Sequence, residues 1–154
     1  MTENKLKRRL GLFLVASHLC VLFSAIISKL VGGLSVDEFT TVLAVVTPMF
    51  AGFTGAVIAF FVENRHVATD SSPKITRTFS NLALLLPGVL VALTIMSIFL
   101  KSINVGFSDF EDMKRFLIAM ESLLAAYIST IVFTLFPKSP AQASGVPLAE
   151  DNKP

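Results

Sequence analysis

Two side chains that can gain or lose a proton stand inside long apolar runs. Glu121 interrupts the segment FLIAMESLLAAYIST, and His18 interrupts GLFLVASHLCVLF. An acid inside a membrane span can line a water-filled path or a polar ring in an oligomer. An imidazole in such a place can sense pH or ligate a cofactor. Each also has a structural alternative, with Glu121 bonded to Ser or Thr hydroxyls and His18 bonded to Tyr127 or Thr54.

Helical geometry predicts which polar groups share a depth, because an α-helix rises about 1.5 Å per residue. We expect Glu121 about 7 Å below the outer boundary and His18 about 12 Å from the cytoplasmic side. The two side chains are then roughly 10 Å apart along the membrane normal, too far for a direct contact. The first level also holds hydroxyls of the other three runs, namely Ser24, Thr47, Thr94 and Ser97, and the second level holds Thr54 and Tyr127.

Signatures of enzymatic chemistry are missing from the sequence. It has no Gly-rich phosphate loop, no Cys/His metal spacing and no Ser, His and Asp set that topology could bring together. Cys20 is the single cysteine, and His66 is the second of two histidines and follows the second apolar run, which argues against a bis-histidine haem site. We therefore predict a protein that is not an enzyme and that uses no metal or cofactor.

The elements that must hold these polar groups are four long apolar runs. Hydrophobic residues make up 53% of the 154 residues, charged residues 16%, and the mean hydropathy is +0.73. A soluble domain of this length could not bury so much apolar surface. The sequence predicts an all-α integral membrane four-helix bundle in one domain, 1–138, followed by a disordered tail, 139–154. The predicted spans are 10–31, 42–62, 81–100 and 116–136, each about 20 residues long.

Basic residues predict the orientation of these spans. Nine of the thirteen Lys and Arg residues lie in the N-terminus, the loop 63–80 and the tail. The positive-inside rule then places both termini in the cytoplasm of a multi-pass protein, in the inner membrane if the source is bacterial. Basic residues beside a bilayer set topology and contact anionic lipid heads, so we predict no nucleic-acid partner.

Small residues form faces on two of the predicted helices. In the second run, Ala51, Gly55 and Ala59 recur at four-residue spacing with Gly52 and Ala56 beside them; the fourth run has Ala125 and Ser129. Such faces allow a second helix to approach closely, which favours packing in lipid. They indicate packing inside one bundle or association between subunits. Pro48, in the same run, could kink it.

The two outer loops resemble each other at an offset of 73 residues. Gly33 matches Gly106, and a Ser-x-x-Glu pattern recurs as Ser35 with Glu38 and as Ser108 with Glu111. Each pattern can form a capping box at the start of the next helix. The likeness is explained by convergence, or by a duplicated helical hairpin whose halves are related by an axis along the membrane normal.

The chain resembles the four-span membrane subunits of bacterial antiphage defence systems, of the Kiwa membrane-subunit type, in span number, short loops and inward basic residues. The resemblance implies a homo-oligomer in the bilayer that works with a cytosolic protein, with the loop 63–80 and the tail 137–154 as docking candidates. We therefore expect a membrane subunit that self-associates and anchors, senses for or regulates that partner in defence. The alternative is an ion channel or small-solute permeation protein that uses Glu121 and the hydroxyl groups.

Overall fold

The structure is a computed structural model that describes residues 2–63, 73–107 and 109–135, with the side chains of 63 and 132–135 left aside. Four helices account for nearly all of these residues: α1 (Glu3–Leu30), α2 (Val36–Glu63), α3 (Arg77–Ser102) and α4 (Phe110–Leu135). The described ranges contain no strand, and one isolated bridge joins Thr2 to Lys74. The all-helical prediction is confirmed.

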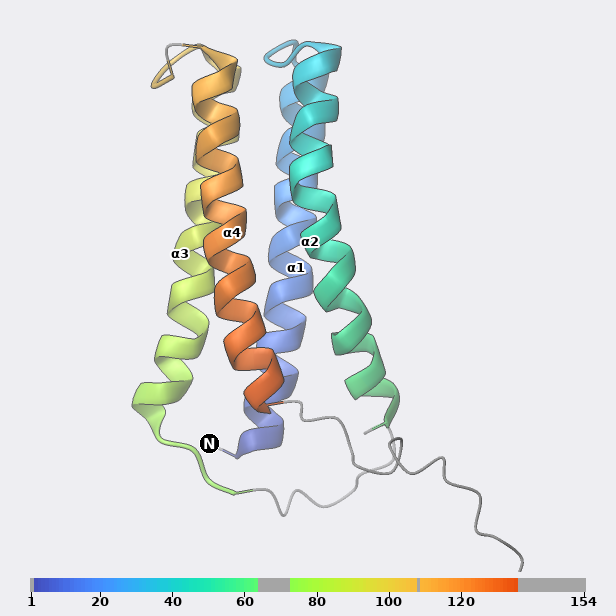
Figure 1. Cartoon of the computed structure of the whole chain (residues 1–154), viewed down its shortest axis with the longest axis vertical. Helices are drawn as coiled ribbons and strands as arrows, with labels where there is room; N and C mark the ends of the chain where they lie inside the picture. Colours follow the sequence, from blue (N-terminus) through green and yellow to red (C-terminus); the bar gives the residue numbers. More distant parts are fainter. Residues whose placement is uncertain (1, 64–72, 108, 136–154) are drawn as a thin grey trace, which may run out of the picture.

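The four helices stand side by side and form a ring in the order α1, α2, α4, α3 (Figure 1). α1 packs against α2 and α3, and α4 packs against the same two helices. A rotation of one hairpin onto the other about a central axis would instead place α1 and α3 at opposite corners. The arrangement therefore differs from the predicted rotational repeat. The first helices of the two hairpins, α1 and α3, are neighbours, and so are the second helices, α2 and α4. A sideways displacement, and not a rotation, relates one hairpin to the other.

Apolar side chains at helical spacing fill the centre of the bundle. Each helix buries one stripe, as an amphipathic helix does, yet its remaining faces are also apolar. Leu12, Phe23 and Leu85 expose 60% or more of their surface, which suits contact with lipid chains. The buried stripes comprise Leu6, Leu10, Leu14, Val21 and Ala25 of α1, Val42, Val46, Phe53 and Val57 of α2, Ala83, Leu90, Val91 and Ile98 of α3, and Met113, Leu117, Leu124 and Ile128 of α4.

Three of the helices, α1, α2 and α3, are long and apolar enough to cross a membrane by length and composition. This supports a membrane protein. The fourth predicted span, 116–136, ends outside the described residues, so its crossing stays a prediction. The predicted tail, 139–154, also lies outside them.

The two outer loops share chemistry but differ in length. Residues 31–35 join α1 to α2, whereas 103–109 join α3 to α4. The backbone hydrogen bonds at the start of the loops repeat at an offset of 72, which pairs Gly32 with Asn104, both at positive φ (79° and 56°). Ser35 and Glu38 form the predicted capping box, with Glu38 N–H donating to Ser35 Oγ (3.2 Å) and Ser35 N–H to Glu38 Oε2 (2.7 Å).

At the start of α4 the cap differs from the prediction. Asp109 takes the capping position, where its Oδ1 accepts the N–H of Asp112 at 2.9 Å. The predicted capping residue, Ser108, lies outside the described residues, and Glu111 accepts hydrogen bonds from Lys114 Nζ (3.2 and 3.4 Å). A short acidic side chain placed one residue later performs the same task, because it also satisfies an amide of the first turn.

The α1–α2 loop closes against the end of α3. A Cβ atom at Gly33 would stand 2.7 Å from the Cα of Ser102, closer than real side-chain carbons come to backbone. Only glycine therefore fits at this point, where the first hairpin contacts the second.

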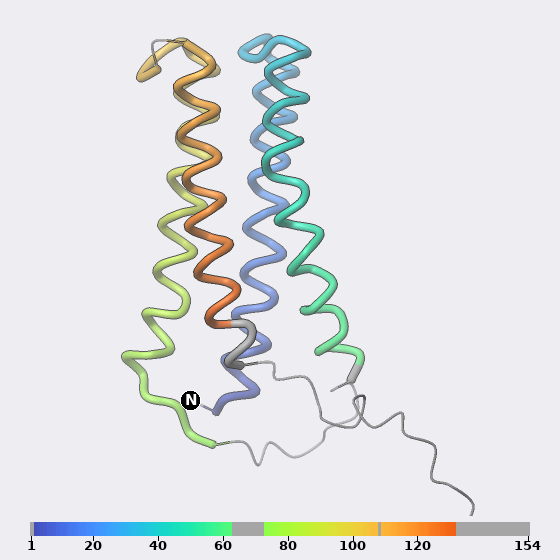
Figure 2. The backbone as a smooth tube through the Cα atoms, viewed as in Figure 1, coloured from blue at the N-terminus to red at the C-terminus, as the bar shows by residue number. Residues whose placement is uncertain are grey.

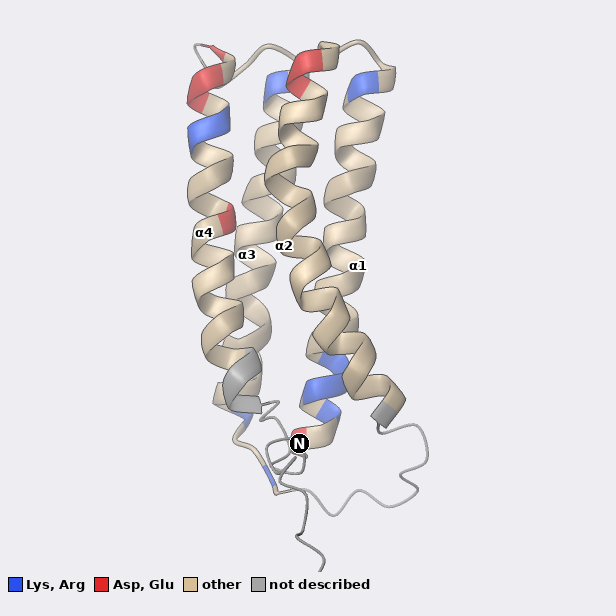
Figure 3. Ribbon diagram, turned by 45° about the vertical axis from the view of Figure 1, so that its right-hand side comes forward, with Lys and Arg blue, Asp and Glu red and all other residues tan. Residues whose placement is uncertain are grey.

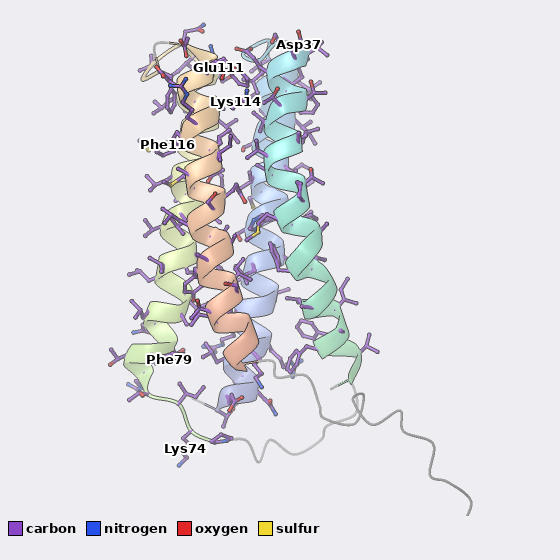
Figure 4. All side chains as sticks on the ribbon, in the orientation of Figure 1. Asp37, Lys74, Phe79, Glu111, Lys114 and Phe116 are labelled. Atoms are coloured by element: carbon purple, nitrogen blue, oxygen red, sulfur yellow. The ribbon has the colours of Figure 1, made fainter. Side chains whose placement is uncertain are left out.

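The opposite end of the bundle is tied by the segment before α3. The N–H of Glu3 donates to the carbonyl of Pro73 at 3.0 Å, beside the bridge between Thr2 and Lys74. Asp37, Glu111 and Lys114 lie at the loop end, and Lys74 lies at this opposite end (Figure 4). Figure 3 shows basic residues at both ends, whereas the first turns of α2 and α4 carry acidic residues at the loop end, and one more acidic stretch lies midway along α4.

Candidate functional site

An open groove of about 450 Å³ runs between α2 and α4. Its walls are apolar on the α2 side and carry two polar side chains, Glu121 and Ser122, on the α4 side. The full lining is Val45, Pro48 and Met49 of α2 with Ile118, Glu121, Ser122 and Ala125 of α4. The groove is thus the place where the one acid within the predicted fourth span meets a neighbouring helix.

Glu121 has no hydrogen-bond or ion-pair partner among the described residues. The residue is only 7% exposed, and its Oε2 atom is buried without a partner. A buried polar group without a partner costs free energy, and a buried charge costs more. Glu121 therefore stands in the groove as an unsatisfied acid.

Three of the four hydroxyl groups predicted at the level of Glu121 instead donate hydrogen bonds to backbone carbonyls of their own helices. Ser24 donates to the carbonyl of Val21 (2.8 Å), Thr94 to that of Leu90 (3.1 Å), and Ser97 to that of Thr94 (2.8 Å). Thr47 is exposed on α2. The predicted bonding of Glu121 to these hydroxyls is wrong, because each short hydroxyl reaches a carbonyl of the preceding turn more easily than a side chain across the bundle.

The second predicted polar level also does not form a network. His18 is fully buried, with Nδ1 3.1 Å from the Leu14 carbonyl oxygen and its ring packed on Phe53 (centroids 4.5 Å apart) and Phe50 (6.0 Å). Its Nε2 atom has no partner, and neither has Thr54 Oγ1.

Tyr127 reaches a different helix. Its hydroxyl donates to the carbonyl of Ala83 and so joins α4 to α3. The predicted bond from His18 to Tyr127 or Thr54 is therefore wrong.

Proline shapes the α2 wall of the groove. Pro48 has no N–H, so it cannot donate to the carbonyl of Ala44 one turn earlier. Figure 2 shows the axis of α2 changing direction in its middle part, where Pro48 lies, in agreement with the predicted kink. The α2 wall of the groove is therefore formed by the part of the helix that contains the proline.

The small residues of α2 point away from the bundle. Ala51, Gly52, Gly55, Ala56 and Ala59 are all exposed, and a Cβ added at Gly52 or Gly55 would meet nothing within 4 Å. On α4, Ser129 is exposed and Ala125 lies half-buried in the groove wall. Packing of the α2 stripe within the bundle, one of the two predicted uses, is thus not observed.

The described part of the chain holds no cluster of three or more His, Cys, Asp or Glu residues that could bind a metal ion. Comparisons with protein-family models, with curated proteins and with solved structures gave no match to this chain. Functional inference therefore depends on the geometry.

Three groove residues were not singled out by the sequence. Val45, Met49 and Ile118 are ordinary apolar residues, and their role depends on which face each helix turns toward its neighbour. A weak signal was available, because Val45 and Met49 are four residues apart and flank Pro48, so they share a face with the kink.

Proposed function

We propose that this protein is a membrane subunit that self-associates through the small-residue face of α2 and anchors a cytosolic protein at its basic end. The observation that carries the proposal is the open face formed by Ala51, Gly52, Gly55, Ala56 and Ala59. Larger side chains are exposed on the same side of α2 toward its end, Ile58 at 56% and Val62 at 54%. The small residues therefore form a shallow surface that bulkier groups border at one end.

Such a surface favours another helix over lipid. No hydrophobic effect separates helices from lipid chains, so association depends on close van der Waals packing, which small residues permit. Because no helix of the same chain covers the α2 face, a second copy is the natural occupant. This fits the oligomeric assembly that the likeness to antiphage-defence membrane subunits implies.

The proposed binding of a cytosolic partner is based on exposed basic residues at one end of the bundle. Lys5, Arg8, Lys74 and Arg77 are exposed at the end where α1 begins and the segment before α3 contacts it. We place this end, with both termini, in the cytoplasm of a multi-pass protein. There it would attract an acidic surface of a cytosolic protein, such as a defence effector. Of the predicted docking segments, 63–80 and 137–154, residues 64–72 and 137–154 lie outside the described residues.

Subunit counting in lipid vesicles tests self-association. Fluorescently labelled protein is reconstituted at decreasing density, and stepwise photobleaching reports copies per complex. We expect the wild type to form oligomers and Gly55→Leu to shift them toward monomers. Ala92→Leu, a small-to-large change at an exposed position of α3, is the matched control and should leave the complex intact.

A monomeric wild type at every density contradicts the proposal.

Anchoring is tested separately, by purification from native membranes with and without Lys74→Glu and Arg77→Glu. A soluble protein that is recovered with the wild type and lost with the charge reversals supports the docking role.

A permeation pathway is the second candidate, and one observation favours it. His18 Nε2, Thr54 Oγ1 and Glu121 Oε2 are buried without partners on three helices, and buried polar atoms of this kind are commonly satisfied by water. Ion flux into protein-containing vesicles tests this function. Flux that Glu121→Gln reduces would support it, and absence of flux in wild-type vesicles would remove it.

A further inference from the structure

We propose that the groove between α2 and α4 is a binding site for an ammonium group attached to an apolar body, with Glu121 as its counter-ion. This goes beyond the function proposed above. The α2 residues that line the groove are Val45, Pro48 and Met49, whereas the self-association face is Ala51, Gly52, Gly55, Ala56 and Ala59. The two sites are therefore built from different residues and can be tested separately.

Charge is the first argument. The described ion pairs join Lys7 to Glu3 (2.7 Å), Lys101 to Glu38 (3.4 Å) and Lys114 to Glu111 (3.2 Å), and none involves Glu121. An acid only 7% exposed, with an unpartnered Oε2, requires a cation or a donor to offset the loss of water. An ammonium ion supplies the opposite charge, and a primary or secondary one also supplies N–H donors.

Shape is the second argument. At about 450 Å³ the groove lies within the ordinary range of small-molecule sites, roughly 300–1,000 Å³. Its lining is the usual combination for such sites, with several apolar side chains and a few polar groups that fix orientation. Ser122 lines the groove next to Glu121 and is its second polar residue. A bare metal ion would find few oxygen ligands and much hydrocarbon, so a cation with an apolar body fits better.

A second copy of the chain is a poorer occupant of the groove. Two copies docked by the same surface about a twofold axis would bring one Glu121 toward the other, and like acids repel. The described cations that could serve a partner's Glu121 lie at the two ends of the bundle, not at the depth of the groove. Charge complementarity thus selects a ligand rather than a subunit.

The binding test compares a cation with a neutral compound of the same shape. Full-length protein is placed in nanodiscs of phosphatidylglycerol, which carries no amine, and is titrated with benzyltrimethylammonium or with neopentylbenzene, which has carbon in place of nitrogen. Ligand-observed NMR measures both affinities. We expect the cation to bind at least about tenfold more tightly than the neutral compound, as a charge-assisted contact in a dry site requires. Glu121→Gln should remove this difference.

Three variants separate the groove from background binding. Glu111→Gln removes an exposed acid from the same helix and should leave both affinities unchanged. Ala125→Phe fills the groove and keeps the acid, so it should weaken the binding of both compounds. If Glu121→Gln does not fold, this variant tests whether the compounds bind in the groove. Ser122→Cys in a Cys20→Ala background reports whether a second copy covers the groove through disulfide formation.

The source of the ammonium is distinguished by the lipid. If the natural occupant is an aminolipid head, adding phosphatidylethanolamine to the discs should compete with the probe and lower its apparent affinity. If it is a free amphiphilic amine, the aminolipid should have no effect. Equal binding of the two compounds, binding unchanged by both Glu121→Gln and Ala125→Phe, or crosslinking of Ser122→Cys between copies would each overturn the proposal.

Discussion

Two carboxyl groups of this chain show how strongly the surroundings decide what a residue does. Glu38, at the rim four residues before the apolar run 42–62, accepts the Ser35 N–H at 2.7 Å and pairs with Lys101 Nζ at 3.4 Å. These contacts lower its pKa below the ordinary value of 4.5, chiefly through the backbone hydrogen bond from Ser35. Glu121 has no such contact. The first carboxylate holds a loop in place, whereas the second has no partner among the described residues.

The lowered pKa of Glu38 predicts a dependence of stability on pH. A carboxyl with a depressed folded-state pKa contributes stability above its unfolded pKa, and this is lost as pH falls through the folded-state pKa. We expect Glu38→Ala to lower the unfolding temperature at pH 7, with the deficit shrinking below about pH 4.5. Thermal unfolding in detergent, followed by circular dichroism, measures this. Glu111→Ala, which removes an exposed pair, is the control. A deficit that stays constant down to pH 3 would contradict the prediction.

At the scale of single elements, α2 combines features that a simple membrane anchor does not need. Its first turn is closed by a capping box, its middle contains Pro48, and its outward face is lined with Gly and Ala. Gly and Pro both weaken an isolated helix. Their accumulation in one helix indicates that its surface and its bend matter more than its own stability.

Glycines at two positions should respond oppositely to the same change. Gly33→Ala places a methyl group against the Ser102 backbone, so the loop or α3 must shift, at a cost of about 1–3 kcal/mol. Gly55→Ala meets open space and raises helix propensity, so it should be neutral or stabilising by up to about 1 kcal/mol. Denaturant titration in mixed micelles measures both changes. Equal destabilisation by the two substitutions would show that the α1–α2 loop does not contact α3 as described.

The sequence predicted the existence and type of the four helices, because a run of about 20 apolar residues has few other solutions in lipid. The predicted apolar spans begin at 10, 42, 81 and 116, and the helices that contain them begin earlier, at Glu3, Val36, Arg77 and Phe110. Polar residues in the first turns extend each helix beyond its apolar run, and α2 and α4 also begin with side-chain caps.

The partners of the polar groups were predicted poorly. A residue's depth follows from counting along the chain, whereas its direction depends on how each helix is rotated in the bundle. His18 was placed inside the bundle correctly but faces phenylalanines, and Glu121 faces α2 rather than the hydroxyls.

At the scale of the whole molecule, both hairpins run in the same direction, and their loops lie at one end (Figure 1). The loop end carries the acidic first turns of α2 and α4, and the opposite end carries the basic start of α1. A bilayer with a cytoplasmic side that favours Lys and Arg would orient such a molecule in a single way.

Cysteine labelling in intact cells checks this orientation. In a Cys20→Ala background, Val105→Cys in the α3–α4 loop should react with a membrane-impermeant maleimide added outside. Lys74→Cys should react only after permeabilisation, because it lies at the opposite end, which we propose to be cytoplasmic. Both positions are exposed, so access alone does not distinguish them. Labelling of both from outside would contradict a cytoplasmic location of that end.

The contact of Gly33 with Ser102 also constrains the order of biosynthesis. Ring neighbours α1 and α3 are separated in the chain by the whole of α2, so the surface of α1 that α3 covers is exposed to lipid while the second hairpin is still being synthesised. The loop of the first hairpin cannot pack against Ser102 until the ribosome has passed that residue. A chain stalled before that point should leave a half-molecule with one apolar seam open, a ready substrate for membrane proteases.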